Sequence, residues 1–203
     1  FINDQPVLLY CPQGLSKDVL DYGNIYPNMY KIGQSFDTNK AAMIDPSPIQ
    51  NLDFGFDCYA TQAFNAPDGR ALAVSWLGLP DVEYPSDRFD HQGALSLVKE
   101  LTLKDGKLYQ YPVPAIKDLR AEEQPFTALA ESTNSYELEL DFAANTEHEI
   151  VLFADKDGKG LRINFDLKAG QVTVDRSQAG EPFALDFGTS RSCNIDKEAT
   201  NAS

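Results

Sequence analysis

Two acids, a tyrosine, a glutamine and the only tryptophan lie on two predicted neighbouring strands within residues 52–81. Side chains of these types bind sugars. Carboxylates accept charge-assisted hydrogen bonds from hydroxyl groups, and aromatic rings offer apolar faces to sugar C–H groups. The two acids are four positions apart, so on a strand both point to one face. The pattern predicts a substrate-binding site made of Asp53, Asp57, Tyr59, Gln62 and Trp76.

A structural interpretation of the same residues is also open. An acid placed before Phe-Gly often accepts hydrogen bonds from the backbone N–H groups of its own turn, as Asp53 would here. A lone tryptophan between Val74 and Leu77 is typically a core residue, because its burial removes a large apolar area from water. The chain would then be a non-catalytic carbohydrate-binding or purely structural β-protein.

Other chemistries find no support in the sequence. His91 and His148 are isolated from further ligands at metal-binding spacing, which argues against a metal site. There is no glycine-rich phosphate loop between a strand and a helix, and no G-x-S-x-G nucleophile motif. We therefore expect neither a metal nor another cofactor.

The composition further limits the classes of binding partner and the cellular location that we expect. The net charge of −14 over 203 residues leaves no basic stripe that could neutralise the phosphates of nucleic acid. No apolar run is long enough to cross a membrane. Three widely spaced cysteines, an odd number, favour a reducing cytoplasm over a disulfide framework. A cytoplasmic protein that binds a small sugar fits these limits.

Alternation of apolar and polar residues with a period of two dominates the chain and predicts an all-β fold. Strands are expected at residues 6–11, 28–32, 58–64, 71–76 and 94–103, and then at 136–142, 150–153, 161–167 and 172–174. The turn signals at 155–160 and 168–170 join the last of these strands into hairpins. The short, regularly spaced strands are typical of a propeller, a barrel or a sandwich.

One segment breaks this pattern. Ile116 and Leu119 lie at helical spacing after Pro114, which predicts a short helix over residues 114–123. We place the domain boundary there, with a first domain at 1–112, a linker helix at 113–124 and a second domain at 125–203. The chain begins with Phe1 and becomes polar after Cys193, so we expect either a fragment that is truncated at both ends or an unusually small second domain.

The order D-F-G-F-D-x-Y-A-x-Q-x-F, D-G-R and W-x-G-L-P-D in residues 52–81 resembles one segment of the β-fructosidases of glycoside hydrolase family 32. Residues 10–15, 22–26, 78–86 and 99–110 are also similar to the propeller of this family, and 174–177 and 187–193 to its C-terminal sandwich. The likeness covers most of the chain. It implies the last blades of a five-bladed β-propeller, followed by a truncated β-sandwich.

The resemblance implies a retaining glycosidase that releases fructose from sucrose or sucrose 6-phosphate by double displacement, without a cofactor. The sequence boxes that carry the family's nucleophile, acid/base and stabilising acid should all lie before Phe1. No residue of this chain is therefore assigned a catalytic role, and we expect the chain alone to be inactive. A partial propeller exposes strand edges, so we also expect dimers or aggregation. Ala63, Ser75 and Val98-Lys99 depart from the family pattern, which leaves the substrate preference open.

Overall fold

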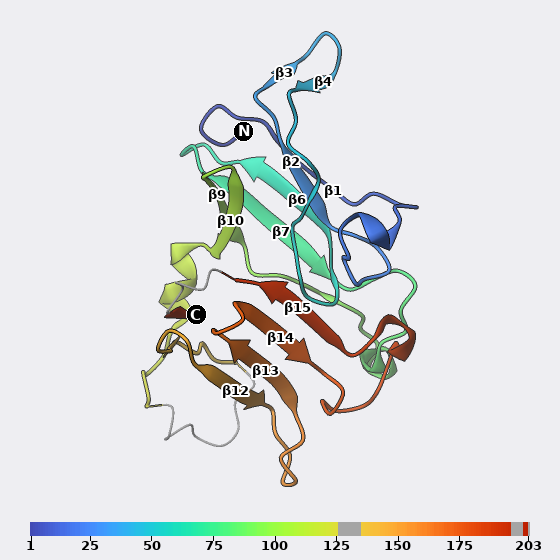
Figure 1. Cartoon of the computed structure of the whole chain (residues 1–203), viewed down its shortest axis with the longest axis vertical. Helices are drawn as coiled ribbons and strands as arrows, with labels where there is room; N and C mark the ends of the chain where they lie inside the picture. Colours follow the sequence, from blue (N-terminus) through green and yellow to red (C-terminus); the bar gives the residue numbers. More distant parts are fainter. Residues whose placement is uncertain (126–134, 196–200, 203) are drawn as a thin grey trace. The chain divides into compact units, whose positions relative to one another are not determined.

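The computed structural model describes residues 1–125 and 135–195, together with the backbone of residues 201–202. The chain divides into two compact units, Phe1–Val113 and Pro114–Ser203. Both consist of antiparallel strands with short 3-10 helices between them (Figure 1). Within the described residues no helix is long and apolar enough to cross a membrane.

The first unit contains two sheets and a hairpin. The smaller sheet has the order β1-β2-β5, and the larger has the order β10-β9-β7-β6 with β8 paired to β7. The strands of the smaller sheet are β1 (Val7–Tyr10), β2 (Met29–Ile32) and β5 (Gln50–Asn51), and those of the hairpin are β3 (Ser35–Asp37) and β4 (Ala42–Ile44). Those of the larger sheet are β6 (Cys58–Asn65), β7 (Ala71–Leu77), β8 (Ala94–Leu95), β9 (Lys99–Lys104) and β10 (Lys107–Pro112).

The alternation predicted for β7 decides which face of the larger sheet packs inward. Ala71, Ala73 and Ser75 are buried, whereas Leu72, Val74 and Trp76 between them are partly exposed. The buried face joins Ile2 and Leu101 in one core cluster. Apolar residues of β1, β9 and β10 pack against this cluster and also against a second cluster on the smaller sheet, so the core lies between the two sheets. The opposite face of β7 is left for the site.

The single strand expected at residues 94–103 is divided into β8 and β9. Ser96 lies in the gap and binds β7 through both backbone and side chain. Its N–H donates to the Ser75 carbonyl at 2.9 Å, while its hydroxyl accepts the Ser75 N–H at 3.0 Å. The side chain thus takes the place of a carbonyl in the ladder and interrupts the strand.

The second unit is built on a four-stranded sheet with the order β12-β13-β14-β15 (Figure 1). Its strands are β12 (Glu147–Leu152), β13 (Leu161–Asp166), β14 (Gln171–Asp175) and β15 (Ser190–Asn194), and β11 (Leu140–Asp141) pairs separately with β16 (Asn201–Ala202). The predicted hairpins at residues 155–160 and 168–170 are both present. In the first turn the Asp155 carboxylate accepts the N–H groups of Asp157 and Lys159.

Two predictions for this unit need correction. The alternating segment at residues 136–142 forms a strand only at Leu140–Asp141. Glu137 and Glu139 instead bind the guanidinium of Arg120, so the alternation there reflects ion pairs on one side and packed rings on the other. The helix expected over 114–123 is the 3-10 helix η3 (Pro114–Leu119), which ends before Arg120 turns to these acids.

Candidate functional site

Tyr59 and Trp76 form the centre of the candidate site. They are cross-strand partners on β6 and β7, and their ring centroids lie 6.4 Å apart with 52° between the ring planes. Both side chains are half-buried. Cross-strand partners project from the same side of a sheet, so both rings stand on the face of β7 that the core leaves open.

A bulge in β6 brings Gln62 onto this same face. The pairing register shifts between Tyr59 and Gln62, and Ala60 adopts a positive φ of 48°. In an unbroken strand, residues three apart point to opposite faces. The bulge adds a residue to one strand, so Gln62 pairs with Val74 on the side that also carries Trp76. The structure therefore brings Tyr59, Gln62 and Trp76 onto one face.

A buried polar cluster supports the bulge from the opposite side. The Asn28 amide nitrogen donates to the Thr61 hydroxyl at 2.8 Å and to the Cys58 carbonyl at 3.3 Å. The Thr61 and Ser75 hydroxyls lie 2.7 Å apart. Asn28, Thr61 and Ser75 are each at most 8% exposed. Buried polar groups that find partners rigidify a core, so this cluster fixes the backbone that carries Tyr59.

Two thiols belong to the same cluster. The Cys11 thiol contacts the Asn28 carbonyl oxygen at 3.6 Å, and the Asn28 amide nitrogen contacts the Cys58 sulfur at 3.7 Å. Burial raises the pKa of Cys11, which the backbone N–H groups of Ala60 and Thr61 partly offset. Burial also raises the pKa of Cys58, and the nearby Asp53 carboxylate adds to that effect. Both side chains are therefore neutral thiols at neutral pH and act as packing elements.

The two predicted acids differ in their surroundings. The Asp53 carboxylate accepts the Gly55 N–H at 2.8 Å, the turn contact that its sequence also allowed, and it lies near the Cys58 thiol. Cys58 is buried and adjacent to Tyr59 in β6, so it faces the opposite side of the strand. Asp57 contributes its backbone carbonyl, which accepts the Gly78 N–H at 2.8 Å. That hydrogen bond ties the segment after β7 to the start of β6.

The Trp76 indole lies directly against two glycines. A Cβ atom at Gly78 would stand 2.6 Å from the indole Nε1, and one at Gly93 would stand 2.3 Å from the same atom. Real Cβ atoms do not approach other atoms so closely, so any larger residue at either position would displace the ring. The absence of a side chain at the two glycines therefore leaves the space that the indole occupies beside Tyr59.

Two further residues adjoin these rings and were not predicted from the sequence, namely Tyr26 and Asp81. The Tyr26 ring stacks on Tyr59, with centroids 5.3 Å apart and 27° between the planes. The Tyr26 hydroxyl donates to the Asp81 carboxylate, and this hydrogen bond raises the pKa of Tyr26. The two residues are separated by 55 positions, so no local pattern could have indicated the contact. We call Tyr26, Tyr59 and Trp76 the aromatic row.

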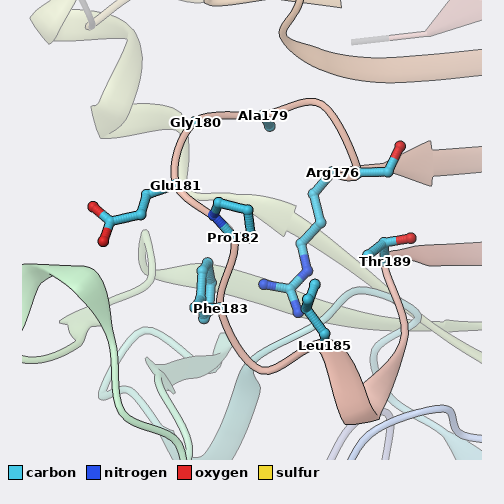
Figure 2. A pocket seen from close by; sticks show the side chains of 9 residues that line it. Arg176, Ala179, Gly180, Glu181, Pro182, Phe183, Leu185 and Thr189 are labelled. Carbon is cyan, nitrogen blue, oxygen red and sulfur yellow. The ribbon is translucent and has the colours of Figure 1, made fainter.

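The second unit contains a hollow of a different kind (Figure 2). Its empty space is ≈ 270 Å³, including open solvent, and Arg176 and Phe183 lie in its lining. The Arg176 guanidinium stacks 4.2 Å above the Phe183 ring and donates to the carbonyls of Ala184 and Gly188. The Arg176 side chain therefore stabilises the loop that lines the hollow. Among the described residues no group of three His, Cys, Asp or Glu side chains could hold a metal ion.

The chain matches two domains of one family along its length. The "Glycosyl hydrolases family 32 N-terminal domain" matches residues 2–112, and "Glycosyl hydrolases family 32 C terminal" matches residues 111–202. The chain is 64% identical over 200 residues to the sucrose-6-phosphate hydrolase of Streptococcus mutans serotype c, with 98% of this chain and 42% of that protein covered. It is 46% identical over 206 residues to the corresponding enzyme of Pediococcus pentosaceus, with 98% and 41% covered.

Solved structures show the same relationship. The sucrose-6-phosphate hydrolase from Lactobacillus gasseri superimposes with a TM-score of 0.85 at 39% identity, covering 99% of this chain and 42% of that one. A β-fructofuranosidase of Bombyx mori has a TM-score of 0.68 at 24% identity, with 97% and 41% covered, and shows the fold alone. The chain thus spans about 42% of the length of these relatives. With domain matches from residue 2 to residue 202, the chain belongs to glycoside hydrolase family 32.

Proposed function

We propose that this chain is part of a longer retaining β-fructofuranosidase that hydrolyses sucrose or sucrose 6-phosphate. The observation that carries the proposal is the 64% identity to a sucrose-6-phosphate hydrolase along 98% of the chain. Identity at this level across both matched domains supports a common substrate class as well as a common fold.

The role of this chain in such an enzyme is to hold the sugar. Tyr59 and Trp76 offer partly exposed ring faces, and Gln62 offers amide donors and acceptors on the same side of the sheet. A mostly apolar wall with a few polar groups is the usual lining of a small-molecule site. Asp53 and Asp57 complete the proposed substrate-binding set on the strength of the sequence resemblance alone. The Asp53 carboxylate lies near the buried Cys58 thiol, on the side of β6 opposite to Tyr59.

The reaction itself needs two carboxyl groups about 5–5.5 Å apart, one as nucleophile and one as acid/base. We assign neither to this chain and expect both in the remainder of the longer protein. The proposed division is a set of propeller blades at residues 1–112, a linker at 113–124 and sandwich strands from 125 onward. The three cysteines, all in the described part of the chain, form no disulfide, which supports a cytoplasmic location. Association into dimers through exposed strand edges is part of the same proposal.

Steady-state assays of the full-length protein that contains this chain test the proposal. We expect release of fructose from both sucrose and sucrose 6-phosphate without added metal or cofactor. A higher kcat/KM for the phosphate ester would identify the preferred substrate. Full-length protein that folds but releases no fructose from either sugar would refute the proposal.

The alternative is a binding or structural β-protein without hydrolytic function, in which the aromatic row packs a core. The half-exposed side chains of Tyr26, Tyr59 and Trp76 favour a site over a core. Trp76 is the only tryptophan, so its emission reports on this row. We expect fructose or sucrose at high millimolar concentration to shift the emission of the chain. An unchanged emission in a full-length protein whose other tryptophans are replaced would favour the structural role.

A further inference from the structure

We propose that Tyr26 and Asp81 form one end of the sugar-binding wall, where they accept an uncharged, hydroxyl-rich part of the substrate and exclude its phosphate. This inference rests on the proposed function and names two specificity-determining residues that it does not include. Tyr26 is the end ring of the aromatic row, with Tyr59 between it and Trp76. Asp81 is hydrogen-bonded to this end ring.

Three separate segments build this end of the wall. Tyr26 comes from the segment before β2, Tyr59 from β6, and Asp81 from the segment after β7. The ring of Tyr26 covers Tyr59, while its hydroxyl reaches Asp81. Stacking and the hydrogen bond therefore fix one tyrosine in both position and orientation, as a binding surface requires.

The segment that carries Asp81 is itself held in place. Leu79 and Val82 on either side of it are only 2% and 4% exposed. The Leu79 N–H donates to the Tyr84 hydroxyl at 2.9 Å, and the Val82 carbonyl accepts the Gln92 side-chain amide at 2.7 Å. Asp81 between them is exposed. Its carboxylate is thus a fixed group at the surface rather than a mobile one.

The chemistry of the pair defines what it can bind. An ionised carboxylate has two oxygens and about four acceptor positions, and the Tyr26 hydroxyl uses one of them. The remaining positions suit sugar hydroxyls, which would form charge-assisted hydrogen bonds beside the stacked rings. The raised pKa of Tyr26 keeps its proton in place at neutral pH. A phosphate at this position would meet a fixed negative charge instead of a donor.

Two variants of the full-length protein test the pair. Asp81→Asn keeps the shape of the side chain but removes its charge, and Tyr26→Phe keeps the ring but removes the hydroxyl. We expect both to raise KM for sucrose, Asp81→Asn by about 10-fold or more, as hydrogen bonds to charged groups allow. The value of kcat should change by less than about threefold, because the proposal gives both residues a role in binding and none in the chemical step. Asp105→Asn is the matched control, an exposed acid in the turn between β9 and β10.

A separate measurement tests whether the negative charge of Asp81 repels the phosphate of the substrate. Asp81→Asn removes a repulsion that acts only on the phosphate ester, so the ratio of KM for sucrose 6-phosphate to KM for sucrose should fall. A ratio that stays constant or rises overturns the exclusion of phosphate. KM values for sucrose equal to those of the Asp105→Asn control overturn the site, provided that thermal unfolding shows all variants folded. If the unmodified full-length protein releases no fructose, both this inference and the proposed function are overturned. If the unmodified protein is active and the two variants have the same KM values as the control, only this inference is overturned.

Discussion

Replacing Gly93 with alanine is expected to displace the Trp76 indole and to destabilise the first unit by about 2–4 kcal/mol. Gly93 has a φ of +74°, and a Cβ atom there would lie 2.3 Å from the indole Nε1 and 3.0 Å from the Leu77 carbonyl oxygen. The ring could rotate away, but the backbone oxygen could not. Urea unfolding followed by the fluorescence of Trp76, the only tryptophan, measures both stability and ring environment.

The controls separate steric from backbone effects. Gly106 has a similar φ of +71°, but a Cβ atom there would have no heavy atom within 4 Å. Gly106→Ala should therefore cost only about 1–2 kcal/mol and leave the emission unchanged. Gly78→Ala should shift the emission through its contact with the indole. Equal stability and equal emission for Gly93→Ala and Gly106→Ala would show that the indole does not lie against Gly93.

Replacing Asn28 with alanine is expected to lower the free energy of unfolding of the first unit by about 2–4 kcal/mol. The amide of Asn28 binds Thr61, Cys58 and Cys11 in a buried setting. Its loss would leave the Thr61 hydroxyl and the Cys58 carbonyl with fewer partners away from water. Unfolding by urea and the rate of alkylation of Cys58, which is 7% exposed, would both report the loosened cluster.

Asn51→Ala is the matched control for Asn28. The Asn51 amide nitrogen donates to the Leu20 carbonyl at 3.1 Å, but its buried carbonyl oxygen has no hydrogen-bond partner among the described residues. Removing an unsatisfied acceptor offsets the lost bond, so we expect a cost of about 1 kcal/mol or less. If Asn51→Ala lowers the free energy of unfolding as much as Asn28→Ala does, the cluster around Asn28 does not stabilise this unit more than an ordinary buried amide.

Strands were predictable where one face is buried. The alternation in residues 71–76 and 161–167 identified β7 and β13, because burial on one side imposes a period of two. Residues 136–142 show the same alternation without a continuous strand, because Tyr136 packs on Phe153 while its acidic neighbour binds Arg120. Side-chain periodicity records which sides are packed, and it does not record whether the backbone is paired.

The candidate site was predictable only in part. The pairing of Gln62 with Val74, on the face that carries Trp76, follows from two strands joined by the turn at Asp68-Gly69. The bulge at Ala60, which brings Tyr59 opposite Trp76 on this face, carries no glycine and no other local signal. Tyr26 and Asp81 meet through the tertiary fold alone. Sequence reasoning therefore found the residues of the two strands and missed those that the connecting segments bring to them.

The central claim is that this chain supplies a sugar-binding wall while the catalytic carboxyl groups lie in the rest of a longer enzyme. Release of fructose from sucrose by the isolated chain and by the full-length protein, at equal molar concentration, tests it most directly. We expect turnover by the full-length protein and none by the chain above the uncatalysed rate. Turnover by the purified chain within about tenfold of the full-length rate, a loss of less than about 1.4 kcal/mol in barrier, would contradict the claim and place the catalytic acids within residues 1–203.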